Sequence, residues 1–153
     1  MKRQTLTAAL AVAALTLSAC SEPLKTGGNG KICADFKVAK ASPGAAVAGG
    51  AVVLDECLKR WAYSLAPSRD GAEVVAEAAR AACGAQLASW NQQIVTQAGA
   101  DGEAASLMTG EPTTPLAEHN GYAERRAIFY VVQARAGSCP APPAKDGAPE
   151  GVG

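Results

Sequence analysis

Aromatic residues are scarce in this 153-residue sequence, which contains two Phe, two Trp, three Tyr and a single histidine, His119. Alanine is abundant instead. Because alanine is the best helix former and is depleted in strands, this composition favours closely packed helices. No block of basic residues is present, so nucleic-acid binding has no electrostatic basis. The longest apolar run, residues 6–17, is shorter than the roughly 20 residues of a membrane-spanning helix, so we expect no permanent anchor helix.

The first twenty residues have the three zones of a secretory signal. Lys2 and Arg3 give a basic start, and residues 6–17 are apolar apart from two threonines. Ser18-Ala19 then places two small residues before Cys20. This order of basic, apolar and small residues predicts export and removal of the segment.

Leu17-Ser18-Ala19-Cys20 resembles the lipobox of bacterial lipoproteins in all four positions. The resemblance implies that residues 1–19 are the cleaved signal peptide and that Cys20 becomes a lipid-modified N-terminus, with palmitate-like chains holding the protein on a membrane. Two or more such chains anchor a protein stably, whereas one does so only marginally. Ser21 after the cysteine favours the outer membrane, with the protein facing the periplasm. The alternative is an ordinary signal cut after Ala19.

The mature chain keeps four cysteines if Cys20 carries lipid. Four cysteines in an exported chain predict two disulfides, which persist in the oxidising envelope. A metal site would need clustered ligands, and no CxxC pair is present, so we predict neither a metal nor any other cofactor. Twelve basic and fourteen acidic residues remain once Lys2 and Arg3 leave with the signal, a net charge of −2.

The sequence divides into four parts. After the signal, residues 20–31 contain Pro23 and a glycine-rich run, which predicts a flexible tether behind the lipid. Residues 32–139 form the predicted domain, which begins with an alternating, extended segment over 32–38. One short strand cannot form a sheet alone, so we expect this segment to lie along the helices. The Pro/Ala/Gly-rich tail, residues 140–153, is predicted to be disordered.

Three helices are predicted within the domain, and the fold class is therefore all-α. The first covers residues 51–66, where apolar residues recur at three- and four-residue steps. The second covers residues 71–98, with Asp70 as its N-cap. Residues 99–121, rich in glycine and proline, are predicted to be a loop, and the third helix covers residues 122–136.

The first two helices predict a disulfide pairing. If they form an antiparallel hairpin that turns near residue 70, positions whose numbers sum to about 140 face each other. Cys57 and Cys83 meet this condition. By elimination, Cys33 pairs with Cys139 and ties the two ends of the domain together.

No catalytic residue is assigned, and four side chains are candidates for contacting a partner. Trp, Tyr and Arg are typical of interface hot spots and equally typical of partly buried core positions. The candidate interaction residues are Tyr63, Trp90, Tyr122 and Arg126.

Acid/base chemistry has its best candidates in His119 and three carboxylates. His119 lies beside Glu118, although neighbours in sequence rarely point the same way. Glu73, Glu77 and Glu118 invite comparison with helical peptidoglycan-cleaving enzymes, which use a carboxylic acid of raised pKa. Glu73 and Glu77 lie one turn apart and, beside Arg80, also suit a solvated helix face.

Two segments, Cys57–Ala66 and Phe129–Gly137, resemble uncharacterised small envelope proteins of Gram-negative bacteria. No activity is attached to that group, so the resemblance adds no site residue. The sequence favours a lipid-anchored, non-enzymatic interaction or structural module with the membrane and an envelope protein as partners. The alternative is a small envelope hydrolase acting on cell-wall material.

Overall fold

The computed structural model describes residues 32–36, 49–98, 104–106 and 109–152. The predictions for the signal peptide, Cys20 and the tether lie outside these residues. Within them, four helices and two short two-stranded ladders follow one another along the chain. The predicted all-α, disulfide-stapled domain is confirmed, and no helix in the described ranges is long and apolar enough to cross a membrane.

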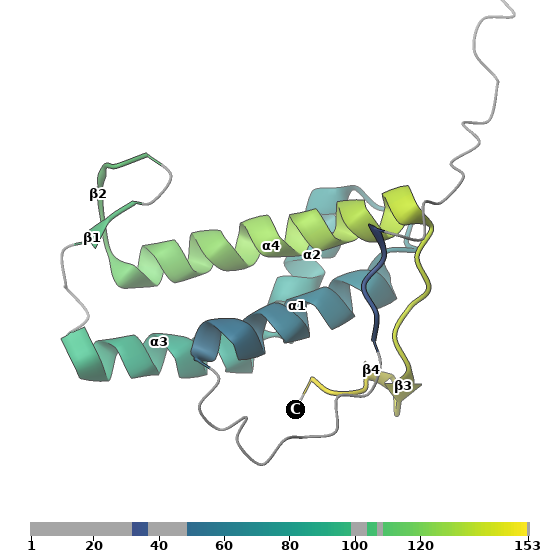
Figure 1. The fold of residues 1–153 in the computed structure, drawn as a ribbon, viewed down its shortest axis with the longest axis horizontal. Helices are drawn as coiled ribbons and strands as arrows, with labels where there is room; N and C mark the ends of the chain where they lie inside the picture. The colour runs from purple at the N-terminus through teal and green to yellow at the C-terminus, as the bar shows by residue number, and fades with distance from the viewer. Residues whose placement is uncertain (1–31, 37–48, 99–103, 107–108, 153) are drawn as a thin grey trace, which may run out of the picture.

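Three of the helices lie side by side (Figure 1). They are α1 (Gly50–Leu65), α3 (Gly84–Ala98) and α4 (Pro115–Gly137), while the shorter α2 (Ala72–Ala82) passes behind α1 and α4. Asp55 near the start of α1 forms a hydrogen bond with Arg126 of α4. Ala66, at the end of α1, forms one with Arg135, which also lies later in α4. The two helices therefore run in the same direction. The third long helix, α3, runs against both of them.

The core lies where α1, α2 and α4 meet. Small alanines of α2 and α4 let the helix backbones approach closely, while larger residues of α1 fill the space between them. The largest fully buried side chains are Tyr63, Leu54, Leu58, Val131, Cys57 and Cys83. Burial of each Leu or Val of this set stabilises the fold by roughly 1.5–3 kcal/mol relative to exposure.

The predicted single helix over residues 71–98 is wrong in one respect, because it is broken at Cys83. This residue leaves helical geometry, with φ −98° and ψ 17°, and its amide bonds carbonyls of the preceding turn. Gly84 follows and has poor helix propensity, so a change of direction costs little there. The break separates α2 from α3 and lets α3 lie along α1.

Both predicted disulfides are confirmed. Cys57–Cys83 joins α1 to the junction of α2 and α3, with Cα atoms 5.9 Å apart. Cys33–Cys139 joins the first described segment to the end of α4, with Cα atoms 5.5 Å apart. The first bridge is buried within the core, whereas both cysteines of the second are partly exposed.

The predicted loop over residues 99–121 ends earlier than expected, because α4 begins at Pro115. Thr114 is its N-cap, and the threonine hydroxyl accepts a hydrogen bond from the Ala117 amide at 3.3 Å. Proline is well suited to the first helical position, where its missing N–H is not needed. Before the helix, β1 (Ala104–Ala105) pairs with β2 (Pro112–Thr113).

The predicted extended segment at 32–38 is not a strand over the part described, residues 32–36. It lies along the helices, as expected for one short extended segment that has no partner strand. The amide of Ala34 donates to the Tyr63 hydroxyl at 3.0 Å, and the Phe36 ring meets the Tyr63 ring edge-on at 4.9 Å between centroids. The alternating pattern therefore reflects side chains that pack on helices rather than on a sheet.

The predicted disordered tail is also wrong, because residues 140–152 fold back onto α1. Strand β3 (Ala144–Lys145) pairs with β4 (Ala148–Pro149) around Asp146-Gly147, and both turn residues have positive φ. This is the geometry of a type I′ turn, for which Asp-Gly is well suited. Arg60 of α1 donates to the Glu150 carbonyl at 2.8 Å and holds the hairpin in place.

Candidate functional site

Two polar clusters lie between the helices, and the first is centred on Asp55 of α1. Its carboxylate accepts hydrogen bonds from the Arg126 Nε at 2.6 Å, the Tyr130 hydroxyl at 2.6 Å and the Tyr122 hydroxyl at 3.1 Å. The three donors come from one face of α4, because they are spaced by four residues. Arg126 also bonds the Tyr130 hydroxyl and lies over the Tyr130 ring. The cluster joins α1 to α4.

The electrostatics of this cluster favour a fixed charge pair. Burial opposes ionisation of Asp55, but the hydrogen bonds from Arg126 and Tyr130 outweigh it and hold the Asp55 pKa below its usual value. The hydrogen bond to Asp55 raises the pKa of Arg126. Burial, together with the bond to Asp55, raises the pKa of Tyr130. At neutral pH the carboxylate is thus ionised and saturated with donors, which makes it a poor general base.

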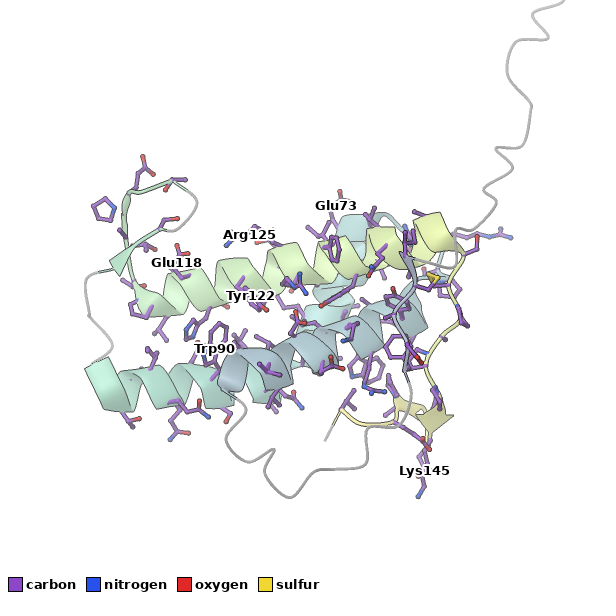
Figure 2. All side chains as sticks on the ribbon, in the orientation of Figure 1. Glu73, Trp90, Glu118, Tyr122, Arg125 and Lys145 are labelled. Atoms are coloured by element: carbon purple, nitrogen blue, oxygen red, sulfur yellow. A yellow bond between two sulfur atoms is a disulfide. The ribbon has the colours of Figure 1, made fainter. Side chains whose placement is uncertain are left out.

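The second cluster is an aromatic stack between α3 and α4. The Trp90 and His119 rings are parallel within 12° and 3.4 Å apart between centroids, and Tyr122 meets Trp90 edge-on at 5.6 Å. His119 Nδ1 lies 2.8 Å from the Asn91 side-chain oxygen. Figure 2 shows Trp90 and Tyr122 between the helices. A Cβ on Gly50 would come within 2.5 Å of Trp90, so glycine lets α1 begin against this ring.

Tyr122 links the two clusters, because its ring contacts Trp90 and its hydroxyl contacts Asp55. Trp90, Tyr122 and Arg126, three of the four candidate interaction residues, are therefore brought together, each of them partly exposed. The fourth, Tyr63, is only 1% exposed and belongs to the core, so its assignment as an interaction residue is corrected. Its hydroxyl accepts a hydrogen bond from the Ala34 amide instead.

The acid/base candidates are dispersed. His119 is 8% exposed, and its ring is held by Trp90 and Asn91. Glu77 pairs with Arg80 on the surface of α2, and this hydrogen bond lowers the Glu77 pKa. A catalytic acid of raised pKa needs the opposite environment. Glu73 is exposed one turn before Glu77, at a different edge of the molecule from Trp90 (Figure 2).

Protonation of His119 is expected to destabilise the fold. Burial lowers the pKa of His119 below its usual value near 6.5, so the folded state disfavours the proton that the unfolded chain accepts. The free energy of unfolding should therefore fall as the pH drops below about 6.5, with a slope of at most about 1.4 kcal/mol per pH unit for one proton. Urea unfolding between neutral pH and pH 5 measures this slope.

The control for this titration is His119→Gln. Because His119 is the single histidine of the sequence, no other imidazole contributes in this range. The variant should have lower stability at neutral pH but a nearly flat dependence between pH 5 and 7. A wild-type protein that gained stability over the same acid range would refute the buried, neutral state of His119.

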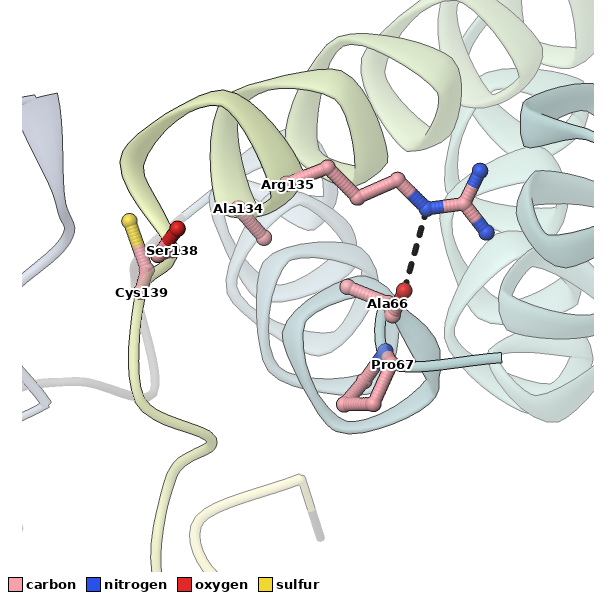
Figure 3. A pocket seen from close by; sticks show the side chains of 6 residues that line it. All are labelled: Ala66, Pro67, Ala134, Arg135, Ser138 and Cys139. Atoms are coloured by element: carbon pink, nitrogen blue, oxygen red, sulfur yellow. Dashed lines mark hydrogen bonds between the residues drawn. The ribbon is translucent and has the colours of Figure 1, made fainter. Parts of the chain in front are cut away.

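A surface pocket of about 280 Å³ lies between the end of α1 and the end of α4. Its charged group is Arg135, whose Nε donates to the Ala66 carbonyl at 3.0 Å (Figure 3). Another nitrogen of Arg135 bonds the Ser68 and Asp70 carbonyls. The guanidinium thus caps the C-terminus of α1, where cations are favoured. The other lining residues are Ala66, Pro67, Ala134, Ser138 and Cys139.

Sequence reasoning missed Asp55, Asn91 and Arg60. Each is one of many polar residues on its helix, and its partner lies far along the chain. The sequence feature that could have indicated the Asp55 cluster is on α4, where Tyr122, Arg126 and Tyr130 share one face. A face with three hydrogen-bond donors predicts an anionic or carbonyl acceptor, but it does not identify the residue that provides this acceptor.

Among the described residues, no group of three His, Cys, Asp or Glu side chains is arranged to hold a metal ion. No family profile, curated protein or solved structure matches the chain. The resemblance to small envelope proteins therefore stays a prediction, and function has to be argued from the chemistry of this chain.

Proposed function

We propose that this protein is a lipid-anchored lipoprotein of the bacterial envelope, held by Cys20 on the outer membrane and facing the periplasm. In this proposal its body is a non-enzymatic interaction or structural module. The lipobox-like Leu17-Ser18-Ala19-Cys20 supports the anchor. Two disulfides in a helical body support an oxidising compartment, where such bonds persist.

One observation carries the non-enzymatic part of the proposal: the charged side chains of the Asp55 cluster and of the pocket are hydrogen-bonded within the fold. Asp55 is saturated by Arg126, Tyr130 and Tyr122, and Arg135 is occupied by backbone carbonyls. Large apolar side chains, in contrast, are left at the surface. They are Ile32, Val52, Val53, Val74, Val95, Phe129 and Val132, all at least 38% exposed. The described surface thus carries exposed apolar side chains that suit contact with a partner, rather than a pair of reactive polar groups.

Metabolic labelling tests the anchor. The full chain, expressed in a Gram-negative bacterium grown with tritiated palmitate, should carry the label and fractionate with the outer membrane. Cys20→Ala should lose essentially all of the label. Retained disulfides, read as protection from an alkylating reagent, would show that the variant still folds. An unlabelled wild-type chain would contradict the anchor.

A cell-wall digestion assay separates this module from the envelope hydrolase. Purified mature protein should release no soluble fragments from insoluble peptidoglycan above a buffer control. Release that His119→Gln, Glu118→Gln or Glu73→Gln abolishes would replace our proposal with the enzymatic one. Crosslinking in intact cells, followed by detergent extraction, then identifies the envelope partner.

A further inference from the structure

One cluster of exposed apolar residues lies at the point where the described chain begins. Phe129 and Val132 are 49% and 51% exposed on α4, and their spacing of three residues places them on one face. Gln133, one turn after Phe129, donates to the Ile32 carbonyl at 2.7 Å. Ile32 itself is 38% exposed. We call Ile32, Phe129 and Val132 the apolar face.

The disulfide fixes this face to the start of the domain. Cys33, next to Ile32, is bonded to Cys139 just beyond the end of α4. A Cβ on Gly137 would lie 3.0 Å from the Ile32 side chain, which places Ile32 against the last turn of α4. The segment that leads back to Cys20 therefore joins the body at the apolar face.

The length of that segment limits the distance between the apolar face and a lipid attached to Cys20. Twelve residues, 20–31, separate the start of the mature chain from Ile32. At 3.3–3.6 Å per residue they span at most about 43 Å when fully extended. A lipid on Cys20 would hold the apolar face within this distance of the bilayer, which raises the effective concentration of the membrane surface. A weak apolar contact then suffices for docking.

One exposed basic residue at the apolar face, Arg125, suits a bilayer. Arg125 lies one turn before Phe129. Arg126, whose guanidinium lies 5.3 Å from the Phe129 ring centre, is already paired with Asp55. The exposed acidic residue nearest to Ile32 in sequence is Asp35. Basic residues attract anionic lipid headgroups. The hydrogen bond to Glu77 is the main cause of the raised pKa of Arg80, and the charge of Glu124 adds to it, which places Glu124 on the side of α4 that faces α2. Glu118 is eleven residues before Phe129, about 16 Å away along the axis.

We propose that the apolar face of Ile32, Phe129 and Val132 rests on the bilayer that holds the lipid of Cys20. This inference rests on the acylation in our proposed function and adds an orientation to it: α4 lies toward the membrane. An isolated exposed valine needs no explanation, whereas a cluster of large apolar side chains marks an interaction surface. Val74 of α2, 62% exposed, provides the contrasting position.

The test places the photoreactive residue benzoylphenylalanine at position 129 or, as the matched control, at position 74. The acylated full chain is reconstituted in vesicles of equal parts phosphatidylethanolamine and phosphatidylglycerol containing tritiated phospholipid. After illumination, we expect at least about tenfold more tritium on the chain labelled at 129 than at 74, as expected for a face favoured by about 1.4 kcal/mol.

Palmitate labelling of the same two variants reports the anchor independently. If Cys20 is acylated but position 129 captures no more lipid than position 74, the membrane-facing orientation is overturned and the anchor stands. Capture of a second copy of the chain at 129 overturns it equally and identifies the occupant. An unacylated Cys20 would overturn both the anchor and this orientation.

Discussion

Replacing Cys57 and Cys83 together by alanine is expected to lower the free energy of unfolding by about 3–4 kcal/mol. The bridge closes a loop of 26 residues, and removing it restores that much conformational entropy to the unfolded chain in the chain-entropy treatment. Both side chains are almost fully buried, at 2% and 0% exposure, so small voids add to the loss. Urea unfolding of the full oxidised chain, followed by circular dichroism, measures the change.

The contrasting variant replaces Cys33 and Cys139 by alanine. Its loop is 106 residues long, so the same treatment gives a loss of about 4–5 kcal/mol. The two variants are distinguished by where amide hydrogen exchange speeds up in the native state. Without Cys33–Cys139, the Ala34 amide should lose protection, because its segment is no longer tied to α4.

Without Cys57–Cys83, the exchange should speed up at the junction of α2 and α3, where the Cys83 and Leu87 amides bond carbonyls of the preceding turn. If those amides stayed protected and only the midpoint of unfolding shifted, the bridge would act on the unfolded chain alone. The bridge would then have no role in fixing the direction in which α3 leaves this junction.

The Cys57–Cys83 bridge was predictable because its register is set within one helical hairpin, and Cys33–Cys139 then followed by elimination. Positions that sum to about 140 face each other in an antiparallel pair, and this rule holds for Cys57 with Cys83. It also holds for Gly50 with Trp90, where α1 begins against the indole ring. The break at Cys83 left the rule intact, since α3 keeps running antiparallel to α1.

The start of α4 and the C-terminal hairpin were not predicted, because local sequence features there favour two different structures. Proline and glycine between residues 99 and 121 predict a loop, but Thr114-Pro115 is also a good helix start, and the helix continues through Gly121 because its other residues bury a long face. In the tail, Asp146-Gly147 favours a hairpin turn. Two-residue strands are too short to be stable alone, so this hairpin needs Arg60 of α1.

The polar clusters could not be predicted, because their partners lie far apart in sequence. Asp55 is separated from Tyr130 by 75 residues, and Asn91 from His119 by 28. Nothing in the sequence near Asp55 distinguishes it from the neighbouring Glu56, which instead pairs with Lys59. Only the direction of α4 along α1 decides which carboxylate meets Arg126.

Asp55→Ala is expected to lower the free energy of unfolding by about 2–3 kcal/mol. It removes charge-assisted hydrogen bonds worth about 1.5–3 kcal/mol and leaves the Tyr130 hydroxyl without its acceptor. Breaking a fully buried ion pair costs more stability than this, but the Arg126 side chain is 36% exposed and can be solvated once Asp55 is removed, so we expect the smaller loss. Tyr130→Phe, which deletes one donor and keeps the ring, should lose only about 1 kcal/mol.

The pH dependence of Asp55→Ala separates lost charge from lost packing. The folded-state pKa of Asp55 is lowered, so its contribution is fully present above the unfolded value near 3.9 and is lost as the pH falls through the folded value. The gap in stability between wild type and Asp55→Ala should therefore be constant from neutral pH to about pH 5 and narrow in stronger acid. A gap that stayed constant to the acid limit of folding would mean that Asp55 acts through its volume, and that its charge does not help to hold α4 against α1.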